Sequence, residues 1–98
     1  IILVAEKDNE LVGFIAFTSE EITWLYIDPK FFRKGYGKKL LSFALSKILR
    51  PVKVTVLINN IRAINFYKGL GFTIDRKQQG KIPLTNIEVA SLRMVLNE

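Results

Sequence analysis

Residues 31–39 read Phe31-Phe32-Arg33-Lys34-Gly35-Tyr36-Gly37-Lys38-Lys39, and the character of the chain changes there from strand to helix. Residues 20–27, before this segment, are rich in β-branched and aromatic side chains, which is typical of a strand. After it, apolar residues recur at helical spacing until Pro51, a residue that commonly follows the end of a helix (Leu40, Leu41, Ala44, Leu45, Ile48 and Leu49). The glycine pair therefore predicts a tight turn that leads directly into a helix.

This turn has the features of a binding site for phosphate groups. Two glycines allow backbone N–H groups to approach a ligand closely, and the start of a helix adds unpaired N–H groups and about half a positive charge. Four cations surround the turn: Arg33, Lys34, Lys38 and Lys39. A diphosphate cradle and a plain loop with a solvated basic face are both consistent with this segment alone. A Walker loop and a dinucleotide fingerprint are excluded, because the glycines that they need are missing.

The whole chain is predicted to fold in the order β-β-β-α-β-α-β-β, an α/β arrangement (α+β, with a mixed sheet). The β-branched run at 52–58 suits a strand buried on both faces and parallel to its neighbour, since a helix precedes it. Asn59 or Asn60 can cap the second helix, which Gly71 ends. A polar loop is expected at 78–86. The predicted strands are 1–6, 11–17, 20–27, 52–58, 72–77 and 89–96, with a hairpin turn at 7–10.

The composition limits the chemistry that is available. The 98 residues include no cysteine and no histidine, which excludes thiolate nucleophiles, His-based triads and the commonest metal ligands, so no metal is expected. A hydrophobic content of 49% supports one folded domain over residues 1–98. The net charge of +6 favours an anionic partner. Apolar runs fall short of the ~20 residues of a membrane span, so a cytoplasmic location without membrane contact is expected.

Two motifs together resemble those of the GNAT superfamily of acyl-CoA N-acyltransferases. The first, [QR]-x-x-G-x-[GA], stands here as residues 32–37, with Phe32 where Gln or Arg is usual and Arg33 one place later. The second, N-x-x-A-x-x-x-Y-x-x-x-G-F, stands as residues 60–72. The resemblance covers roughly Leu11 to Leu96. It implies a core with two splayed parallel strands, whose usual first strand and two helices would belong before Ile1.

The resemblance also implies a reaction and its residues. Acetyl-CoA would be the cosubstrate, with its pyrophosphate in the glycine turn at residues 33–39 (Arg33, Lys34, Gly35, Tyr36, Gly37, Lys38 and Lys39). Backbone groups of Leu25, Tyr26 and Ile27 would bind pantetheine and face the thioester. Tyr67 would protonate the departing sulfur, since a phenol near pKa 10 can donate to a thiolate near 8.5.

Each of the remaining assignments has an alternative in ordinary structure. Glu21 would be the general base, although it also suits a strand edge, and deprotonation through water needs no side chain. Asn60 would contact the cofactor or serve only as a helix cap. Tyr67 could be a core residue with a satisfied hydroxyl. Trp24 could line a substrate pocket with residues 31–32, but core packing is its expected position.

The predicted function is therefore acetyl transfer from acetyl-CoA to a primary amine by direct attack in a ternary complex. The acceptor could be a small molecule, a peptide N-terminus or a lysine. A GNAT-like module that binds acyl-CoA without catalysis is the alternative. A basic nucleic-acid-binding domain is a weaker one, because the aromatic residues sit mostly at apolar-face positions, and no nucleic-acid partner is expected.

Overall fold

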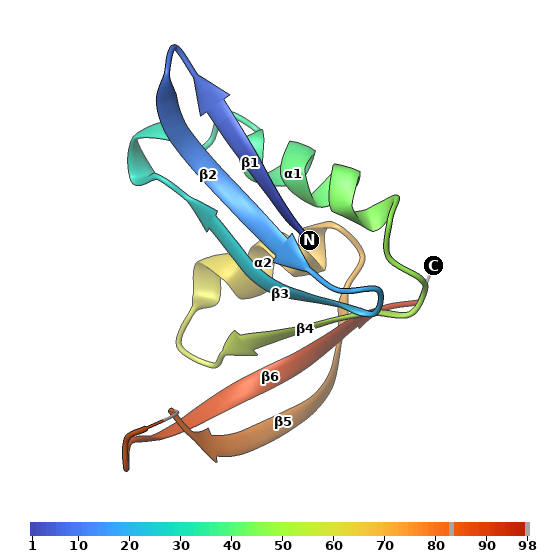
Figure 1. Ribbon diagram of the computed structural model, residues 1–98. Coiled ribbons are helices and arrows are strands. Elements are labelled where there is room, and N and C mark those ends of the chain that lie inside the picture. Colours follow the sequence, from blue (N-terminus) through green and yellow to red (C-terminus); the bar gives the residue numbers. More distant parts are fainter. Residues whose placement is uncertain (83, 98) are drawn as a thin grey trace. The chain divides into compact units, whose positions relative to one another are not determined.

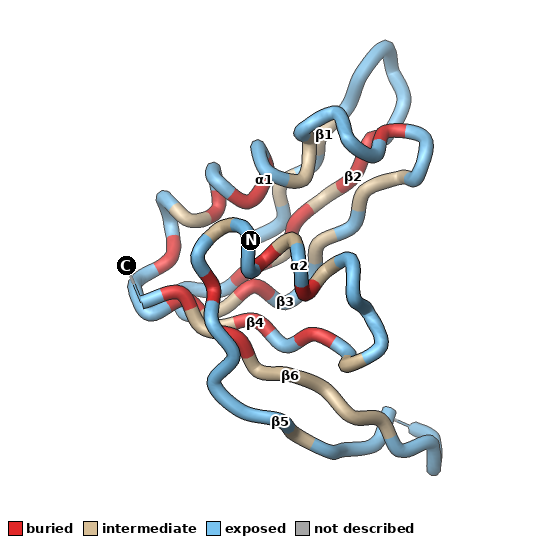
Figure 2. Tube along the Cα trace, turned by 180° about the vertical axis from the view of Figure 1, so that it is seen from behind, coloured by how far each residue is buried: buried red, intermediate tan, exposed pale blue. Residues whose placement is uncertain are grey.

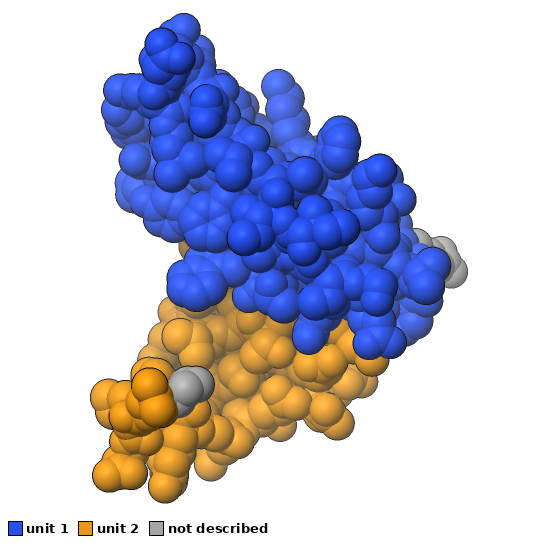
Figure 3. All heavy atoms as spheres, in the orientation of Figure 1, with its two compact units in different colours: residues 1–52 blue, residues 53–98 orange. Residues whose placement is uncertain are grey.

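A computed structural model describes residues 1–82 and 84–97 of the chain. The chain divides into two compact units, residues 1–52 and residues 53–98 (Figure 3). The elements run in the predicted order, and the fold is α+β (Figure 1). The first unit contains β1 (Ile2–Lys7), β2 (Glu10–Phe17), β3 (Glu21–Ile27), a 3-10 turn (Pro29–Phe31) and α1 (Tyr36–Leu45). The second contains β4 (Val52–Leu57, from the unit boundary), α2 (Ile61–Gly69), β5 (Thr73–Lys81) and β6 (Glu88–Leu96).

The first unit is an antiparallel meander in which β2 lies between β1 and β3. The predicted hairpin at 7–10 is confirmed. Asp8 and Asn9 both adopt positive φ, at 52° and 65°, which is the backbone conformation of a two-residue hairpin turn whose twist matches the strands. Helix α1 packs against β2 through Leu40, Leu41 and Ala44, which are buried (Figure 2).

Helix α1 ends earlier than the sequence predicts. The apolar spacing continues to Leu49, but the helix ends at Leu45. The N–H groups of Ser46 and Lys47 bond three residues back, to Phe43 and Ala44, so the last turn tightens. The Leu49 N–H then donates to the carbonyl of Ser19 at 3.1 Å, which draws the chain out of the helical path.

Trp24 does not pack in the core as expected, because 64% of it is exposed. The centroid of its ring lies 6.4 Å from that of the Phe14 ring. The centroid of the Phe14 ring lies in turn 5.8 Å from that of the Tyr26 ring. The strand register places these three side chains on the same sheet face as Val4, which is also exposed. Trp24 therefore belongs to an uncovered apolar face of this unit.

The second unit has β6 between β4 and β5. Its β4 strand is not buried on both faces as predicted: Val52, Val54 and Val56 are buried, whereas Thr55 and Leu57 are exposed. A run of β-branched residues suits a strand that is buried on one face as well as a strand that is buried on both, because strand propensity does not depend on which face is covered. The predicted parallel pairing and splaying of residues 20–27 and 52–58 stay predictions.

The ends of α2 confirm the predicted caps. Asn60 is the N-cap, and its Oδ1 accepts the N–H of Ala63 at 3.2 Å. Gly71 ends the helix region with φ at 100°. The prediction of a polar loop at 78–86 is wrong for its first residues, because β5 continues to Lys81 and Gln78 pairs with Ser91 of β6. Pro83, within that predicted loop, lies outside the described residues.

Candidate active site

The glycine turn forms as a pronounced change of backbone direction before α1. Arg33 and Gly35 both adopt the left-handed conformation, with φ at 63° and 83°. Gly35 is the N-cap of α1 and has no side chain to cap it. The first hydrogen bond of the helix runs from the Lys39 N–H to the Gly35 carbonyl at 3.0 Å. The N–H groups of residues 36–38 consequently have no partner within the helix.

Two aromatic rings hold the ends of this turn. Phe31 is buried, and its ring meets that of Tyr36 edge-on at 5.8 Å, so residues 32–35 loop out between two fixed points. Lys34 and Lys39 lie over these rings, with Nζ at 5.8 Å from Phe31 and 5.9 Å from Tyr36. Of the four predicted cations, the structure thus holds Lys34 and Lys39 against the rings at the two ends of the turn by cation–π contacts.

Lys30 is close to the turn but has another partner. Its Nζ lies 2.9 Å from Glu10 Oε2, and the hydrogen bond and charge of Glu10 raise the pKa of Lys30. This exposed pair holds the base of the turn to the β1–β2 hairpin. Because Lys30 is paired with Glu10, the positive charge near the two glycines comes from the other basic residues of the segment (Arg33, Lys34, Lys38 and Lys39).

The strand that precedes the turn offers peptide groups on its edge away from β2. The Asp28 N–H donates to the Val12 carbonyl at 2.8 Å, and Tyr26 pairs with Phe14. Because bonding alternates along an antiparallel pair, the peptide groups of Leu25 and Ile27 point away from β2. Of the three predicted residues, Leu25 and Ile27 therefore direct their backbone groups away from β2, and Tyr26 directs its own toward β2.

Gly13 is a residue of this site that the sequence analysis missed. A Cβ on Gly13 would lie 2.1 Å from the Tyr26 carbonyl oxygen and 2.8 Å from Ile27 Cδ1. The absence of a side chain therefore lets β2 support β3 at the residues expected to face the thioester. A glycine inside an apolar strand is a sequence signal for such a close approach.

Glu21 is not brought next to these peptide groups. It lies at the start of β3, where its N–H donates to Thr18 Oγ1 at 3.1 Å, and its side chain is half-buried. It is four positions from Leu25 in the sequence, which corresponds to roughly 13 Å along a strand. A carboxylate at this position reaches the strand centre only through water.

The other two predicted residues lie on α2 in the second unit. Oδ1 of Asn60 is occupied as the helix cap, so its amide N–H groups are what it can offer a ligand. Tyr67, seven residues later on the same side of the helix, is only 5% exposed. Its ring lies edge-on to Phe66 at 5.3 Å and to Phe72 at 5.2 Å.

Burial raises the pKa of Tyr67 to about 12. The phenol is therefore fully protonated at neutral pH and can donate a hydrogen bond, but it is a poorer acid than a free tyrosine. Proton transfer to a thiolate near pKa 8.5 would be uphill by about 3.5 pKa units, or roughly 5 kcal/mol. The geometry favours hydrogen-bond donation by Tyr67 over complete proton transfer.

Two further observations complete the description of the site. No group of three or more acidic, histidine or cysteine side chains suited to a metal ion occurs within residues 1–82 and 84–97. In the same part of the chain, neither helix has the length and apolar character needed to cross a membrane.

Comparison with known proteins places these features in a family. The model of the acetyltransferase (GNAT) domain matches residues 1–74. The peptidyl-lysine N-acetyltransferase YjaB of Salmonella typhimurium is 37% identical over 92 residues, which cover 88% of this chain and 61% of that protein. The chain thus spans about three fifths of the length of this relative.

Solved structures give the same result for the fold. Apo YjaB from Escherichia coli superposes with a TM-score of 0.81 at 26% identity, over 96% of this chain and 63% of that one. A Bacillus anthracis protein in complex with acetyl coenzyme A gives a TM-score of 0.83 at 22% identity, over 99% and 61% of the two chains.

Replacing Gly13 by alanine should destabilise the first unit. The new Cβ overlaps the Tyr26 carbonyl, and overpacking of this kind costs about 1–3 kcal/mol. Denaturant unfolding of Gly13→Ala should show this loss of unfolding free energy. Gly69→Ala is the matched control, since a Cβ there meets nothing within 4 Å. Equal stability of the two variants would contradict the close approach of β2 and β3.

The raised pKa of Tyr67 predicts a loss of stability at alkaline pH. The folded state holds the phenolic proton up to about pH 12, whereas the unfolded state releases it near pH 10. Unfolding free energy should therefore fall from pH 10 to 12, by up to about 3 kcal/mol, and be unaffected by this group below pH 10. Tyr67→Phe should lack this component in unfolding curves measured across that range. An identical alkaline decline in both proteins would show that Tyr67 ionises normally.

Proposed function

The chain belongs to the GNAT acetyltransferase family, and we propose that it transfers an acetyl group from acetyl-CoA to the side-chain amine of a lysine, by direct attack in a ternary complex. The observation that carries the proposal is the turn at Gly35, where amides without helical partners begin α1 and four cations flank the glycines in the sequence. The lysine acceptor is inferred from the relative named as a peptidyl-lysine N-acetyltransferase.

The turn binds the diphosphate of acetyl-CoA. The N–H groups of residues 36–38 point along the axis of α1 toward its start, where the helix dipole adds positive potential. Left-handed residues at 33 and 35 bend the backbone as in the concave amide arrangements that hold anions. Lys34 and Lys39, placed by Phe31 and Tyr36, add charge without having to be ordered on binding.

Peptide groups of β3 orient the thioester. The N–H groups of Leu25 and Ile27 face away from β2 and can donate to pantetheine and to the thioester oxygen. A donor fixed in a strand stabilises the negative charge that develops on that oxygen when the amine attacks. Gly13 contributes by allowing β2 to hold this part of β3 in place.

Tyr67 stabilises the leaving group. As the amine nitrogen forms its bond to the carbonyl carbon, the carbon–sulfur bond breaks and the electron pair goes to sulfur, and the nitrogen then releases its extra proton to water to give the neutral amide. The Tyr67 hydroxyl, protonated because its pKa is about 12, donates a hydrogen bond to that thiolate. Its burial against Phe72 limits competition from water for this hydrogen bond.

The acceptor lysine loses its proton through water. A lysine ammonium has a pKa near 10.4, so a proton must leave before attack at neutral pH. Glu21 accepts this proton at the end of a water chain, since its distance of roughly 13 Å from Leu25 excludes direct contact with the reacting atoms. Asn60 completes the set by donating its free amide N–H to the cofactor.

Substitution of Gly35 tests the diphosphate site. Gly35→Ala introduces no clash, because a Cβ there meets nothing within 4 Å, and its cost comes from φ at 83°. A left-handed alanine costs about 1–2 kcal/mol, so titration calorimetry should show a loss of coenzyme A affinity of about fivefold to thirtyfold. Gly69→Ala again serves as the control and should bind normally. Unchanged affinity in Gly35→Ala would place the diphosphate elsewhere.

Substitution of Tyr67 tests the leaving-group assignment. Tyr67→Phe keeps the ring contacts with Phe66 and Phe72 and removes only the hydroxyl. The kcat for acetylation of a lysine peptide should fall about tenfold to a hundredfold, at the low end of effects for groups that act on a leaving group. The KM for acetyl-CoA should stay within about twofold. Wild-type turnover in Tyr67→Phe would show that Tyr67 serves only as a core residue and takes no part in the reaction.

A further inference from the structure

Helix α2 ends in a defined set of backbone hydrogen bonds that leads back to Tyr67. The Phe72 N–H donates to the Tyr67 carbonyl at 3.0 Å, and the Gly71 N–H donates to the Lys68 carbonyl, also at 3.0 Å. Leu70 is the C-cap, and Gly71 follows it with φ at 100°. These bonds and the positive φ of the glycine define a Schellman motif. Tyr67 and Phe72 are therefore the two ends of one hydrogen-bonded turn.

The side chains of the same two residues also meet. The centroids of the Tyr67 and Phe72 rings lie 5.2 Å apart with their planes at 66°, an edge-on arrangement that aromatic pairs favour. Tyr67 is 5% exposed and Phe72 is 2% exposed. An apolar contact between these two positions commonly accompanies a Schellman motif. The end of the helix thus holds the ring of Tyr67 as well as its backbone.

The cap is anchored on the sheet of the second unit. Phe72 directly precedes β5, whose first residue, Thr73, pairs with Val95 of β6. A Cβ on Gly71 would lie 3.3 Å from Leu96 Cδ1, so the glycine already lies close to β6. Phe72 is therefore held from two directions, by the end of a helix and by the start of a paired strand. A group supported by rigid elements keeps its position more closely than a group on a loop.

Phe66 is less suited to hold the Tyr67 ring in place. Its ring also lies edge-on to that of Tyr67, at 5.3 Å, but Phe66 is half-buried and is the preceding residue of the same helix. Phe66 therefore moves with Tyr67 whenever α2 shifts. Phe72 lies beyond the helix, so its ring can hold Tyr67 relative to the sheet.

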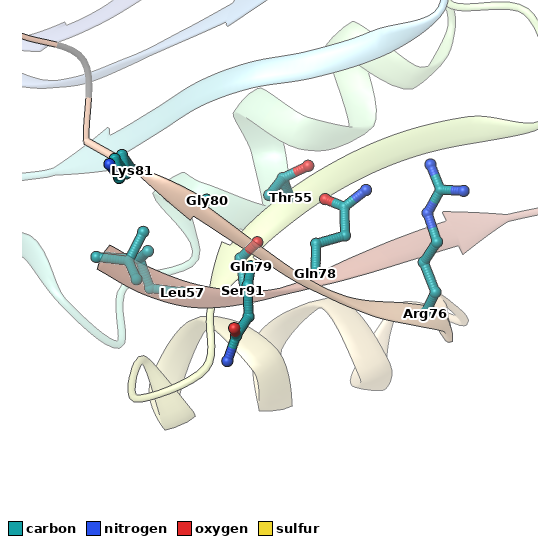
Figure 4. A pocket seen from close by; sticks show the side chains of 9 residues that line it. Thr55, Leu57, Arg76, Gln78, Gln79, Gly80, Lys81 and Ser91 are labelled. Atoms are coloured by element: carbon teal, nitrogen blue, oxygen red, sulfur yellow. The ribbon is translucent and has the colours of Figure 1, made fainter. Parts of the chain in front are cut away.

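The residues of the cap do not line the open depression on the strands of this unit. That depression has a volume of about 640 Å³, and its lining residues come from β4, β5 and β6 (Figure 4). Tyr67, Gly71 and Phe72 are not among them. Substitutions in the cap consequently report on the phenol and leave the lining of the depression unchanged.

We infer that Gly71 and Phe72 are positioning residues for the Tyr67 hydroxyl: Phe72 holds the ring, and Gly71 allows the chain to return to it. This inference rests on the proposed function, in which Tyr67 donates a hydrogen bond to the departing sulfur. Because a hydrogen bond weakens steeply with misalignment, a ring that is free to move stabilises the thiolate less. Both residues act on the reaction through Tyr67.

The test is a double-mutant cycle on the full chain with Phe72→Leu and Tyr67→Phe. Phe72→Leu should lower the kcat for acetylation of a lysine peptide about threefold to tenfold and leave the KM for acetyl-CoA within about twofold. In the Tyr67→Phe background the same substitution should change kcat by less than about 1.5-fold, because no hydroxyl is left to position. Equal losses in the two backgrounds would show that Phe72 does not act through Tyr67.

Phe17→Leu is the matched control. Phe17 lies in β2 of the first unit and is also 2% exposed, so the same atoms are removed from an equally buried site. Phe17→Leu should lower stability in denaturant unfolding and leave kcat within about twofold of wild type. A loss of kcat equal to that of Phe72→Leu would show only general destabilisation, and would overturn the role of Phe72.

Substitution of Gly71 tests the turn itself. Gly71→Ala should also lower kcat, because alanine adopts the positive φ poorly and its Cβ presses on Leu96. Gly71→Asn should retain more of the wild-type kcat, since asparagine is tolerated at this position of a Schellman motif. Gly69→Ala should turn over normally, because a Cβ there meets nothing within 4 Å. Wild-type kcat in Gly71→Ala would show that the turn is not needed.

Absorbance titration of the tyrosines gives a readout besides activity. In the wild-type chain, burial raises the pKa of Tyr67 to about 12. In Phe72→Leu the pKa of this phenol should fall by at least about half a unit toward its ordinary value near 10, because looser packing admits water to the hydroxyl. Phe17→Leu should leave the pKa of Tyr67 unchanged.

The two measurements separate failure of this inference from failure of the proposed function. If Tyr67→Phe turns over like wild type, the proposed function fails. A lowered pKa of Tyr67 in Phe72→Leu would then still support the cap as the structure that holds the phenol, and an unchanged pKa would overturn this inference as well. If Tyr67→Phe loses turnover but Phe72→Leu alters neither kcat nor the pKa of Tyr67, only this inference is wrong.

Discussion

The first unit depends on a backbone that must turn left-handed before α1 can begin. The turn runs from the ring of Phe31 to that of Tyr36, and the rings contact each other at 5.8 Å. Between them the chain reverses its course at Arg33 and Gly35, both with positive φ. Without a side-chain cap at Gly35, the first amides of α1 are left without partners. The proposed anion-binding site would therefore be a consequence of how this helix starts, and the lysines near it would strengthen a site that the backbone already favours.

Burial and chemistry make opposite demands on Tyr67. The contacts with Phe66 and Phe72 hold the ring in one orientation, and the same burial raises the pKa of the hydroxyl to about 12. A strong acid at this position would need a more polar environment, which would loosen the ring. A hydrogen-bond donor needs only a fixed position and a retained proton, and both follow from burial. In the proposed reaction, the packing of α2 thus favours stabilisation of a thiolate by Tyr67 over its protonation.

The sequence was a good guide to whatever depends on local backbone chemistry. The hairpin at Asp8–Asn9, the Asn60 cap and the stop at Gly71 follow from residues with strong conformational preferences, and the structure has all three. It was a poor guide where tertiary contacts decide. Leu49 fits the helical period, yet a bond to Ser19 takes it from the helix. Trp24 suits a core, but the apolar face that carries it is exposed.

The same limit explains which residues of the candidate site could be singled out from the sequence. Motif spacing located the glycine turn and Tyr67, because the backbone and helix geometry there depend on neighbouring residues. Gly13 escaped notice, since its role is a 2.1 Å approach to a carbonyl on another strand. The pairing of Arg76 with Arg93 is similar: the two residues are seventeen positions apart and become neighbours only through the β5–β6 register. A polar stretch such as Lys77–Lys81 looks like a loop in sequence, but it forms part of the edge strand β5, which pairs with β6. Strand pairing, rather than composition, decides whether its charges act together.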